Sequence, residues 1–156
     1  VQLVKRRCAQ AIAVCGEEKM QTLREIGADE VIDRKAPLLE TVGQNAADVV
    51  IDLVAGAQWP ELQEILRVGG RYAVAGAIAG PIVEMDVRTL YLKDHTFFGC
   101  THQPRHVFEN LVSYIERGEI KPLVAKTFEL KDIRDVQEVF LSKQFVGKLV
   151  LVPPQD

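Results

Sequence analysis

Short apolar segments alternate with amphipathic segments along the first half of the chain. Residues 10–15, 30–33, 48–54 and 71–77 are short and rich in apolar side chains, which is typical of buried strands. The segments between them place apolar residues at helical spacing. Because short apolar strands separated by helices pair in parallel and carry helices on both faces, the pattern predicts an α/β fold with a doubly wound parallel sheet.

The predicted helices begin at acids or end at glycines. Glu17 and Glu18 lie in the first turn of the second helix, where the helix dipole favours negative charge, and Gly27 follows its last turn. Gly69 and Gly70 are expected to end a later helix in the same way. The sequence predicts helices or helical turns over residues 2–7, 17–26, 37–43, 58–66 and 88–92.

A fifth strand, a long helix and a different tail follow. The fifth strand is predicted to begin at Thr96 and to end at Thr101. Pro104 is well placed to start a helix whose apolar stripe continues until Gly118. The tail is predicted to be extended, helical and again extended over residues 124–130, 133–141 and 148–152.

Composition and charge narrow the class of protein. The 156 residues include 19 Lys and Arg against 22 Asp and Glu, and this net charge of −3 does not indicate a nucleic-acid-binding surface. The first residues lack the features of a signal peptide, and no apolar run approaches the roughly 18 residues of a membrane span. Three irregularly spaced cysteines predict neither a disulfide framework nor a CxxC metal site. We therefore expect a cytoplasmic protein with no nucleic-acid or membrane partner.

The sequence lacks the glycine-rich turn GxGxxG that cradles the phosphates in a dinucleotide-binding fold. Residues 1–7 are predicted to lie where the helix after such a turn would end. Because the chain also opens at Val1 without an initiator methionine, we expect it to be a piece of a longer polypeptide.

Five segments, in order, resemble one family. They are AVCGEEKMQTLREIGADEVID (13–33), DVVIDLVAG (48–56), LRVGGRYAVAGAIAG (66–80), LYLKDHTFFGCT (90–101) and VGKLVLVP (146–153). They resemble the cofactor-binding domain of the medium-chain dehydrogenases/reductases, which are the zinc-type alcohol dehydrogenases and their quinone oxidoreductase relatives. The resemblance covers almost the whole chain. It implies that the family's N-terminal catalytic domain, first Rossmann strand and glycine-rich turn would lie before Val1.

The resemblance implies a Rossmann-like doubly wound parallel sheet that is incomplete. In the strand order 3-2-1-4-5-6 the missing first strand lies at the centre, and unpaired backbone groups beside it would be costly to bury. Either a longer polypeptide or another chain would have to fill the gap, and we favour the first. We expect a partial dinucleotide-binding domain over residues 1–122. Residues 123–156 form a C-terminal segment that in the family returns toward the catalytic domain.

Residues after the second Rossmann strand bear on the choice of cofactor. A dinucleotide fold meets the adenosine ribose there, where an acid favours NAD(H) and a cation favours the 2′-phosphate of NADP(H). The strand ends at Cys15 and Gly16 without an acid, and Lys19 matches a lysine common in the quinone oxidoreductase branch. This predicts NADP(H) over NAD(H), although Glu17 lies close by and Lys19 alternatively reads as a solvated surface lysine. Arg34 replaces a tyrosine frequent in those relatives and keeps the adenosine end cationic.

The resemblance implies further cofactor contacts at the carboxyl ends of the later strands and near the cofactor's far side. Small residues there let a backbone approach a flat ring closely, and the alternative at each position is an ordinary turn between a strand and a helix. The implied contact residues are Val54, Ala55, Gly56, Ala75, Gly76, Ala77, Phe98, Gly99, Cys100, Gly147 and Lys148.

Other polar residues are assigned structural roles. Cys100, His102 and His106 form a C-x-H-x3-H cluster whose spacing is not a standard zinc spacing, so no metal site is predicted in this segment. The resemblance places any zinc ligands of the whole enzyme outside this chain. Asp52, inside an apolar strand, is expected to bond nearby backbone, and His95 is expected to be structural. No catalytic residue is predicted.

The resemblance therefore implies that the chain is the cofactor-binding part of an oxidoreductase that moves hydride between NAD(P)H and a small alcohol, carbonyl or quinone. Because the cofactor carries this chemistry and the missing domain would bind the substrate, the chain alone is expected to be inactive. The alternative is a non-catalytic nucleotide-sensing or structural module that kept the fold. The apolar edge strand over residues 96–101 predicts a homodimer through this segment.

Overall fold

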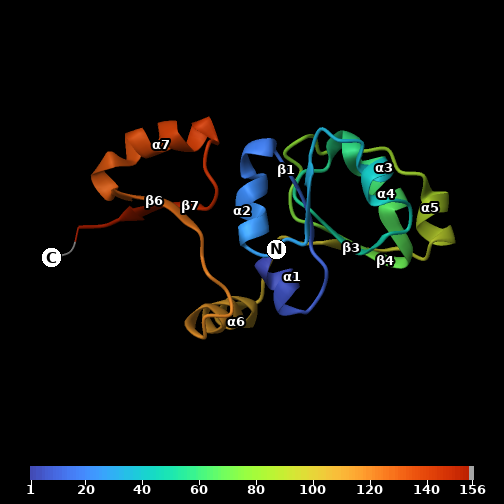
Figure 1. Cartoon of the computed structure of the whole chain (residues 1–156), viewed down its shortest axis with the longest axis horizontal. Coiled ribbons are helices and arrows are strands. Elements are labelled where there is room, and N and C mark those ends of the chain that lie inside the picture. The colour runs from blue at the N-terminus through green and yellow to red at the C-terminus, as the bar shows by residue number, and fades with distance from the viewer. Residues whose placement is uncertain (155–156) are drawn as a thin grey trace. The chain divides into compact units, whose positions relative to one another are not determined.

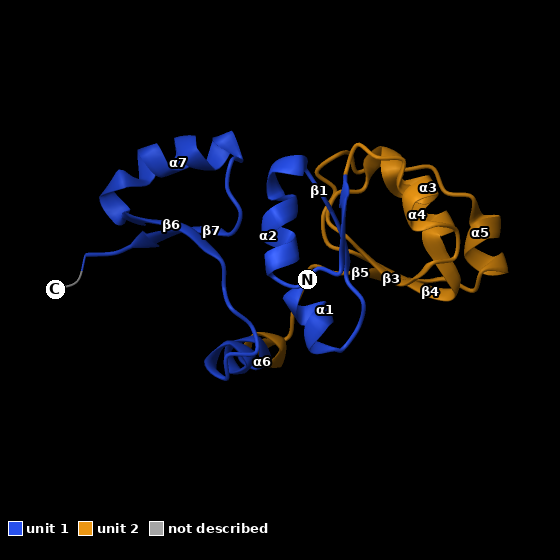
Figure 2. Ribbon diagram, viewed as in Figure 1, with its two compact units in different colours: residues 1–33, 109–156 blue, residues 34–108 orange. Residues whose placement is uncertain are grey.

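The computed structural model describes residues 1–154 and divides into two compact units. Unit 1 consists of Val1–Asp33 and Glu109–Asp156, and unit 2 of Arg34–Phe108 (Figure 2). Every strand pair in both units is parallel, as the alternation of short strands and helices predicts. No helix within residues 1–154 combines the length and the apolar character needed to cross a membrane.

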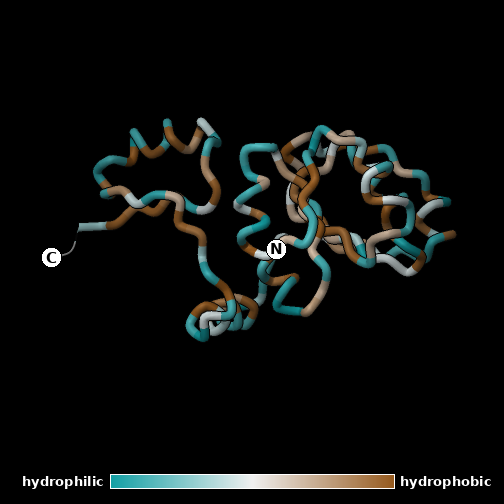
Figure 3. Tube along the Cα trace, in the orientation of Figure 1, coloured by the Kyte–Doolittle hydropathy of each residue, from teal (hydrophilic) through white to brown (hydrophobic). Residues whose placement is uncertain are grey.

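Unit 1 contains two parallel sheets of two strands each. β1 (Ile12–Cys15) pairs with β2 (Glu30–Asp33), and β6 (Val124–Glu129) pairs with β7 (Lys148–Val152). In α7, hydrophobic residues recur at helical spacing and gather on one side of the helix (Figure 3), so α7 has one apolar side. The helical elements of this unit are α1 (Gln2–Arg6), η1 (Glu17–Lys19), α2 (Met20–Glu25), η3 (Leu130–Asp132) and α7 (Ile133–Ser142), and α6 (Arg105–Glu116) enters it from unit 2.

Unit 2 contains one parallel sheet of three strands (Figure 1). The strands are β3 (Ala47–Asp52), β4 (Leu66–Val74) and β5 (Thr96–Gly99), with β4 in the centre. Their carboxyl ends therefore lie at one edge of the sheet, which is where folds of this class bind ligands. The helical elements are α3 (Leu38–Val42), η2 (Gly56–Gln58), α4 (Trp59–Ile65) and α5 (Val87–Leu92).

The core of unit 2 lies between α4 and the sheet. Trp59, Leu66 and Tyr72 are buried together, and Phe97 and Val74 pack against them. The Trp59 and Tyr72 ring centroids are 4.8 Å apart at an interplanar angle of 81°, an edge-to-face contact. Since Tyr72 is only 1% exposed, this aromatic cluster fixes the centre of β4.

The strands do not form one continuous sheet. Within residues 1–154 the strands form three separate sheets, and β1 and β3 are not paired with each other. The expectation that a strand before Val1 would pair with both of them, as the order 3-2-1-4-5-6 implies, stays a prediction. The expected division at residues 122 and 123 follows the architecture of the family and stays a prediction.

One predicted helix end is wrong. The helix α4 ends at Ile65, and Gly69 and Gly70 lie inside β4 instead of capping the helix. The Lys93 ammonium donates hydrogen bonds to carbonyl groups at the end of α4, so that end is satisfied without a glycine, and Leu66 is already extended with ψ 130°. Gly69, with φ +70°, instead serves the irregular start of β4, where the register with β3 shifts.

Candidate functional site

The loops after β3 and β4 are joined by backbone hydrogen bonds at the carboxyl edge of the unit 2 sheet. The Ala75 amide donates to the Asp52 carbonyl at 3.0 Å, and the Ala79 amide donates to the Val54 carbonyl at 2.9 Å. These bonds extend the pairing of β3 and β4 beyond the strands themselves. The predicted contact residues after β3 and after β4 are thus brought together.

The buried carboxylate of Asp52 holds the backbone of the loop after β3 by hydrogen bonds. Its side chain is 6% exposed, and its Oδ1 accepts hydrogen bonds from the amides of Val54 at 2.7 Å and Ala55 at 3.0 Å. Its Oδ2 accepts a hydrogen bond from the Tyr72 hydroxyl. The expectation that Asp52 bonds nearby backbone is confirmed. Its carboxylate supports the loop by accepting the two amide bonds, and the Tyr72 hydroxyl holds the carboxylate in turn.

Tyr72 stays a neutral donor in this arrangement. Burial, with the hydrogen bond to the Asp52 carboxylate, raises the pKa of the Tyr72 phenol well above its usual value. A negative phenolate would be desolvated and would lie against another negative charge. The hydroxyl proton is therefore retained for the bond to Asp52 at every physiological pH.

The loop supported by Asp52 has an unusual backbone. Ala55 has φ 54° and ψ −146°, a conformation that residues with a side chain rarely adopt. Gly56 follows with φ +74°, and a Cβ there would lie 2.9 Å from both the Cβ and the carbonyl oxygen of Ala79. The sequence places its smallest side chains where the two loops touch, which holds their backbones close together.

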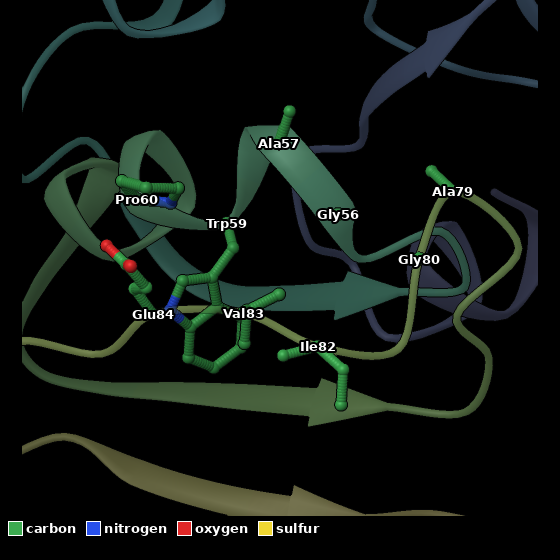
Figure 4. A pocket seen from close by; sticks show the side chains of 9 residues that line it. All are labelled: Gly56, Ala57, Trp59, Pro60, Ala79, Gly80, Ile82, Val83 and Glu84. Atoms are coloured by element: carbon green, nitrogen blue, oxygen red, sulfur yellow. The ribbon is translucent and has the colours of Figure 1, made fainter.

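A cavity of about 290 Å³ opens beside these loops. In Figure 4 the Trp59 ring extends from the start of α4 toward Val83, and Gly56 and Gly80 lie in the neighbouring loops beside it. The lining of the cavity is largely apolar, and Glu84 is the charged residue in it. The lining residues are Gly56, Ala57, Trp59, Pro60, Ala79, Gly80, Ile82, Val83 and Glu84.

The end of β5 adjoins the same edge. The Cys100 amide donates to the Val74 carbonyl at 2.8 Å, and Gly99 is paired with Val74 in the strand register. A Cβ on Gly99 would meet no atom within 4 Å, so the space beside it is open. Phe98 is 46% exposed. The predicted contact residues on three strands of unit 2 thus form one continuous edge.

Arg34 belongs to unit 2 as well, and the remaining predicted residues belong to unit 1. The Arg34 carbonyl accepts a hydrogen bond from Gln58 Nε2 at 3.1 Å, which joins the loop after β2 to the start of α4. Gly16 is buried at the end of β1, and the amide of half-buried Lys19 donates to the Gly16 carbonyl at 3.0 Å.

Gly147 and Lys148 lie at the start of β7, in a different sheet of unit 1 from Gly16 and Lys19. Gly147 has φ +107°, and a Cβ there would lie 2.5 Å from the Leu123 carbonyl oxygen, which requires glycine. Lys148 is exposed and its amide donates to the same carbonyl at 2.8 Å. The structure explains Gly147 by local packing and assigns Lys148 no ligand.

The Cys100, His102 and His106 cluster does not assemble. His106 lies in α6, which begins at Arg105, whereas His102 precedes that helix. Within residues 1–154, no three His, Cys, Asp or Glu side chains are grouped as metal ligands. The Cys100 thiol instead donates to the Phe98 carbonyl at 3.7 Å.

Sequence reasoning missed Trp59 and Tyr72 as parts of the site. Tyr72 is distant in sequence from the loop after β3 that it supports, and Trp59 and Tyr72 each look like an ordinary core aromatic residue in a helix or strand. The available signal was an acid in an apolar strand, because a buried carboxylate needs donors and Tyr72 lies on a strand predicted to be its neighbour.

Comparisons with known proteins agree with this architecture. The profile of the family described as zinc-binding dehydrogenase matches residues 26–151. Quinone oxidoreductase-like protein 2 of Bos taurus is 28% identical over 92% of this chain and 45% of its own length. Acryloyl-coenzyme A reductase of Metallosphaera sedula is 29% identical over 97% of this chain and 46% of its own length.

Solved structures of alcohol dehydrogenases are also similar to this chain. A candidate alcohol dehydrogenase of Sinorhizobium meliloti 1021 is 44% identical with a TM-score of 0.89, covering 99% of this chain and 44% of that protein. A thermostable alcohol dehydrogenase of Pyrobaculum aerophilum is 31% identical with a TM-score of 0.79, covering 97% of this chain and 45% of that protein. The chain thus spans less than half the length of these proteins. It belongs to the zinc-binding dehydrogenase family, whose relatives named here are oxidoreductases.

Proposed function

We propose that this chain binds the nicotinamide cofactor of an oxidoreductase that moves hydride between NADP(H) and a small alcohol, carbonyl or quinone. The observation that carries the proposal is the continuous edge formed by the loops after β3, β4 and β5 in a chain of this family. The names of its relatives, an NAD-dependent alcohol dehydrogenase of Sulfurisphaera tokodaii among them, support the reaction class.

The residues at this edge fit a flat ring lying against backbone. Val54, Ala75 and Ala77 are exposed and carry small side chains, and the space beside Gly99 is open. Such surfaces admit close approach of a ring. When bound, the nicotinamide supplies or accepts the hydride. The chain's own residues would hold the ring at the strand ends, and we assign none of them as acid, base or metal ligand.

The single tryptophan makes binding measurable in the chain itself. Trp59 lies beside the loop that contains Gly56, so a bound reduced nicotinamide would quench its fluorescence. Saturable quenching by NADPH supports the proposal, and unchanged Trp59 emission at millimolar NADPH and NADH contradicts it. Binding without turnover in the full natural polypeptide would favour the nucleotide-sensing alternative.

The preference for NADP(H) rests on Lys19. It is half-buried in η1 directly after β1, where a dinucleotide fold meets the adenosine ribose. Lys19→Ala should weaken NADPH binding at least fivefold more than NADH binding, because only NADPH carries the 2′-phosphate. Lys131→Ala, an exposed lysine paired with Glu129, is the matched control and should change neither. Equal losses for both cofactors with Lys19→Ala would remove the preference.

We also propose that the chain forms a homodimer through β5. This strand is an edge of its sheet within the described residues, and Phe98 on it is 46% exposed. Phe98→Lys should produce monomers in sedimentation velocity, whereas Phe108→Lys, at an exposed site on α6, should not. Phe97 is unsuitable for this test because it packs against the core. A Phe98→Lys variant that sediments like the wild type would contradict the dimer.

A further inference from the structure

Two buried polar groups of unit 2 have no role in the proposed hydride transfer. The Asp52 carboxylate and the Tyr72 hydroxyl bond to each other at the base of the loop after β3. Asp52 is 6% exposed and Tyr72 1% exposed, so neither can touch a ligand. Burying a carboxylate is costly unless it is fully hydrogen-bonded, and the pair therefore requires an explanation.

The carboxylate joins the loop after β3 to the neighbouring strand β4. On one side, its Oδ1 accepts hydrogen bonds from the amides of Val54 and Ala55, at 2.7 and 3.0 Å. On the other side, its Oδ2 accepts the Tyr72 hydroxyl from the neighbouring strand β4. The conformation of the loop is thus connected through one carboxylate to the centre of the sheet.

The loop would not hold this conformation unaided. Ala55 has φ 54° and ψ −146°, a sparsely populated region that is strained for a residue with a side chain. The two amide bonds from Asp52 oppose that strain, but they do so only while the carboxylate keeps its orientation. A carboxylate can rotate about its side-chain bonds, and the second oxygen must therefore also be held.

Tyr72 provides that hold because its ring is buried and packed against two other aromatic rings. Its ring contacts Trp59 at 4.8 Å and Phe97 at 5.4 Å between centroids. The hydroxyl retains its proton, since burial and the adjacent carboxylate raise the pKa of the phenol. A rigid donor of this kind fixes the plane of the carboxylate and the positions of both loop amides.

We infer that Tyr72 is a positioning residue which, through Asp52, sets the backbone of residues 54–56 against the nicotinamide cofactor. This inference rests on the proposed function for its ligand. The loop backbone would lie on a part of the cofactor that NADPH and NADH share. Loss of the Tyr72 hydroxyl therefore weakens both cofactors by the same factor, unlike loss of the Lys19 charge.

Tyr72→Phe tests the inference, because it removes the hydroxyl and keeps the ring contacts. Amide hydrogen exchange at Val54 and Ala55 should become at least tenfold faster, while exchange in the centre of β4 stays within twofold of the wild type. Dissociation constants for NADPH and NADH, followed by Trp59 quenching, should rise by a common factor of about five to ten. Tyr91→Phe, at a site 60% exposed on α5, is the matched control and should change neither readout.

A double-mutant comparison with Asp52→Ala is a second test, which remains informative even if Tyr72→Phe is poorly stable. If Tyr72 acts through Asp52, adding Tyr72→Phe to Asp52→Ala should cause no further loss of cofactor affinity. Additive losses, unchanged exchange at Val54 and Ala55, or equal acceleration throughout β3 and β4 would each overturn the inference. If the wild-type chain binds neither cofactor, the proposed function fails, and hydrogen exchange still decides whether Tyr72 orders the loop.

Discussion

A Cβ atom added to Gly76 would lie 2.7 Å from the carbonyl oxygen of Leu53. Gly76 follows β4 and Leu53 follows β3, so the contact joins the two loops that form the candidate site. The φ angle of Gly76 is not in the left-handed region, and the requirement for glycine comes from space alone. Because the obstructing atom belongs to the backbone, it cannot turn away as a side chain would.

Gly76→Ala should therefore destabilise unit 2 and disturb the site together. Overpacking of this kind costs about 1–3 kcal/mol in the free energy of unfolding, measured by urea denaturation. Gly99→Ala is the matched control, since a Cβ there meets no atom within 4 Å and should change stability by less than about 0.5 kcal/mol. Equal stability of the two variants would show that the loops can separate without cost.

Ala55→Gly should leave stability unchanged or raise it by up to about 1 kcal/mol. Glycine adopts positive φ without strain, which stabilises the folded state. This gain offsets two costs of the substitution, which are the loss of a buried methyl group and the greater conformational entropy of the unfolded chain. Ala28→Gly, at an equally buried alanine without positive φ, should instead lose about 1 kcal/mol. Similar losses at both sites in urea denaturation would show that Ala55 is not strained.

Lys93→Met should destabilise the chain by about 1–3 kcal/mol, because it leaves buried carbonyl groups without a donor. The Lys93 side chain is 14% exposed, and its ammonium donates to the carbonyls of Gln63, Glu64 and Leu66 at 3.0 to 3.2 Å. Methionine keeps most of the apolar length of the side chain and removes the ammonium, with its three donors and its ion pair to Glu64. Lys131→Met, at an exposed ion pair, should cost less than about 0.5 kcal/mol, and a similar cost at both sites would remove the capping role.

The sequence predicts the elements of the fold well where local pattern decides them. β2 has the predicted bounds because its two buried residues, Val31 and Ile32, follow soon after Gly27, the glycine beyond the end of α2. The predicted boundary between α4 and β4 is wrong because the end of α4 depends on hydrogen bonds from Lys93, which lies 27 residues after Leu66 in the chain. A pattern of apolar positions contains no information about a donor that arrives from so far away.

The candidate site was predictable to a similar degree. The loops after strands were expected to meet because parallel strands place their carboxyl ends together, and in unit 2 they do. The bond between Asp52 and Tyr72, which supports the loop after β3, was not expected because it joins residues on two different strands. The register that aligns Asp52 with Val74, and so places Tyr72 within reach, is set by packing of the whole sheet.

Acidification should destabilise the chain through His95. His95 is 9% exposed, and burial followed by the nearby Lys93 charge lowers the pKa of His95. The backbone of Leu66 and Arg67, and then the Glu64 charge, oppose the shift. The folded state thus favours neutral imidazole, so its contribution is complete above the unfolded pKa of about 6.5 and is lost as the pH falls below it. Between pH 7.5 and 5.5, the free energy of unfolding in urea should fall less for His95→Gln than for the wild type. His102→Gln, at an exposed site, should follow the wild type. If His95→Gln loses as much stability as the wild type over this interval, protonation of His95 does not contribute to acid destabilisation.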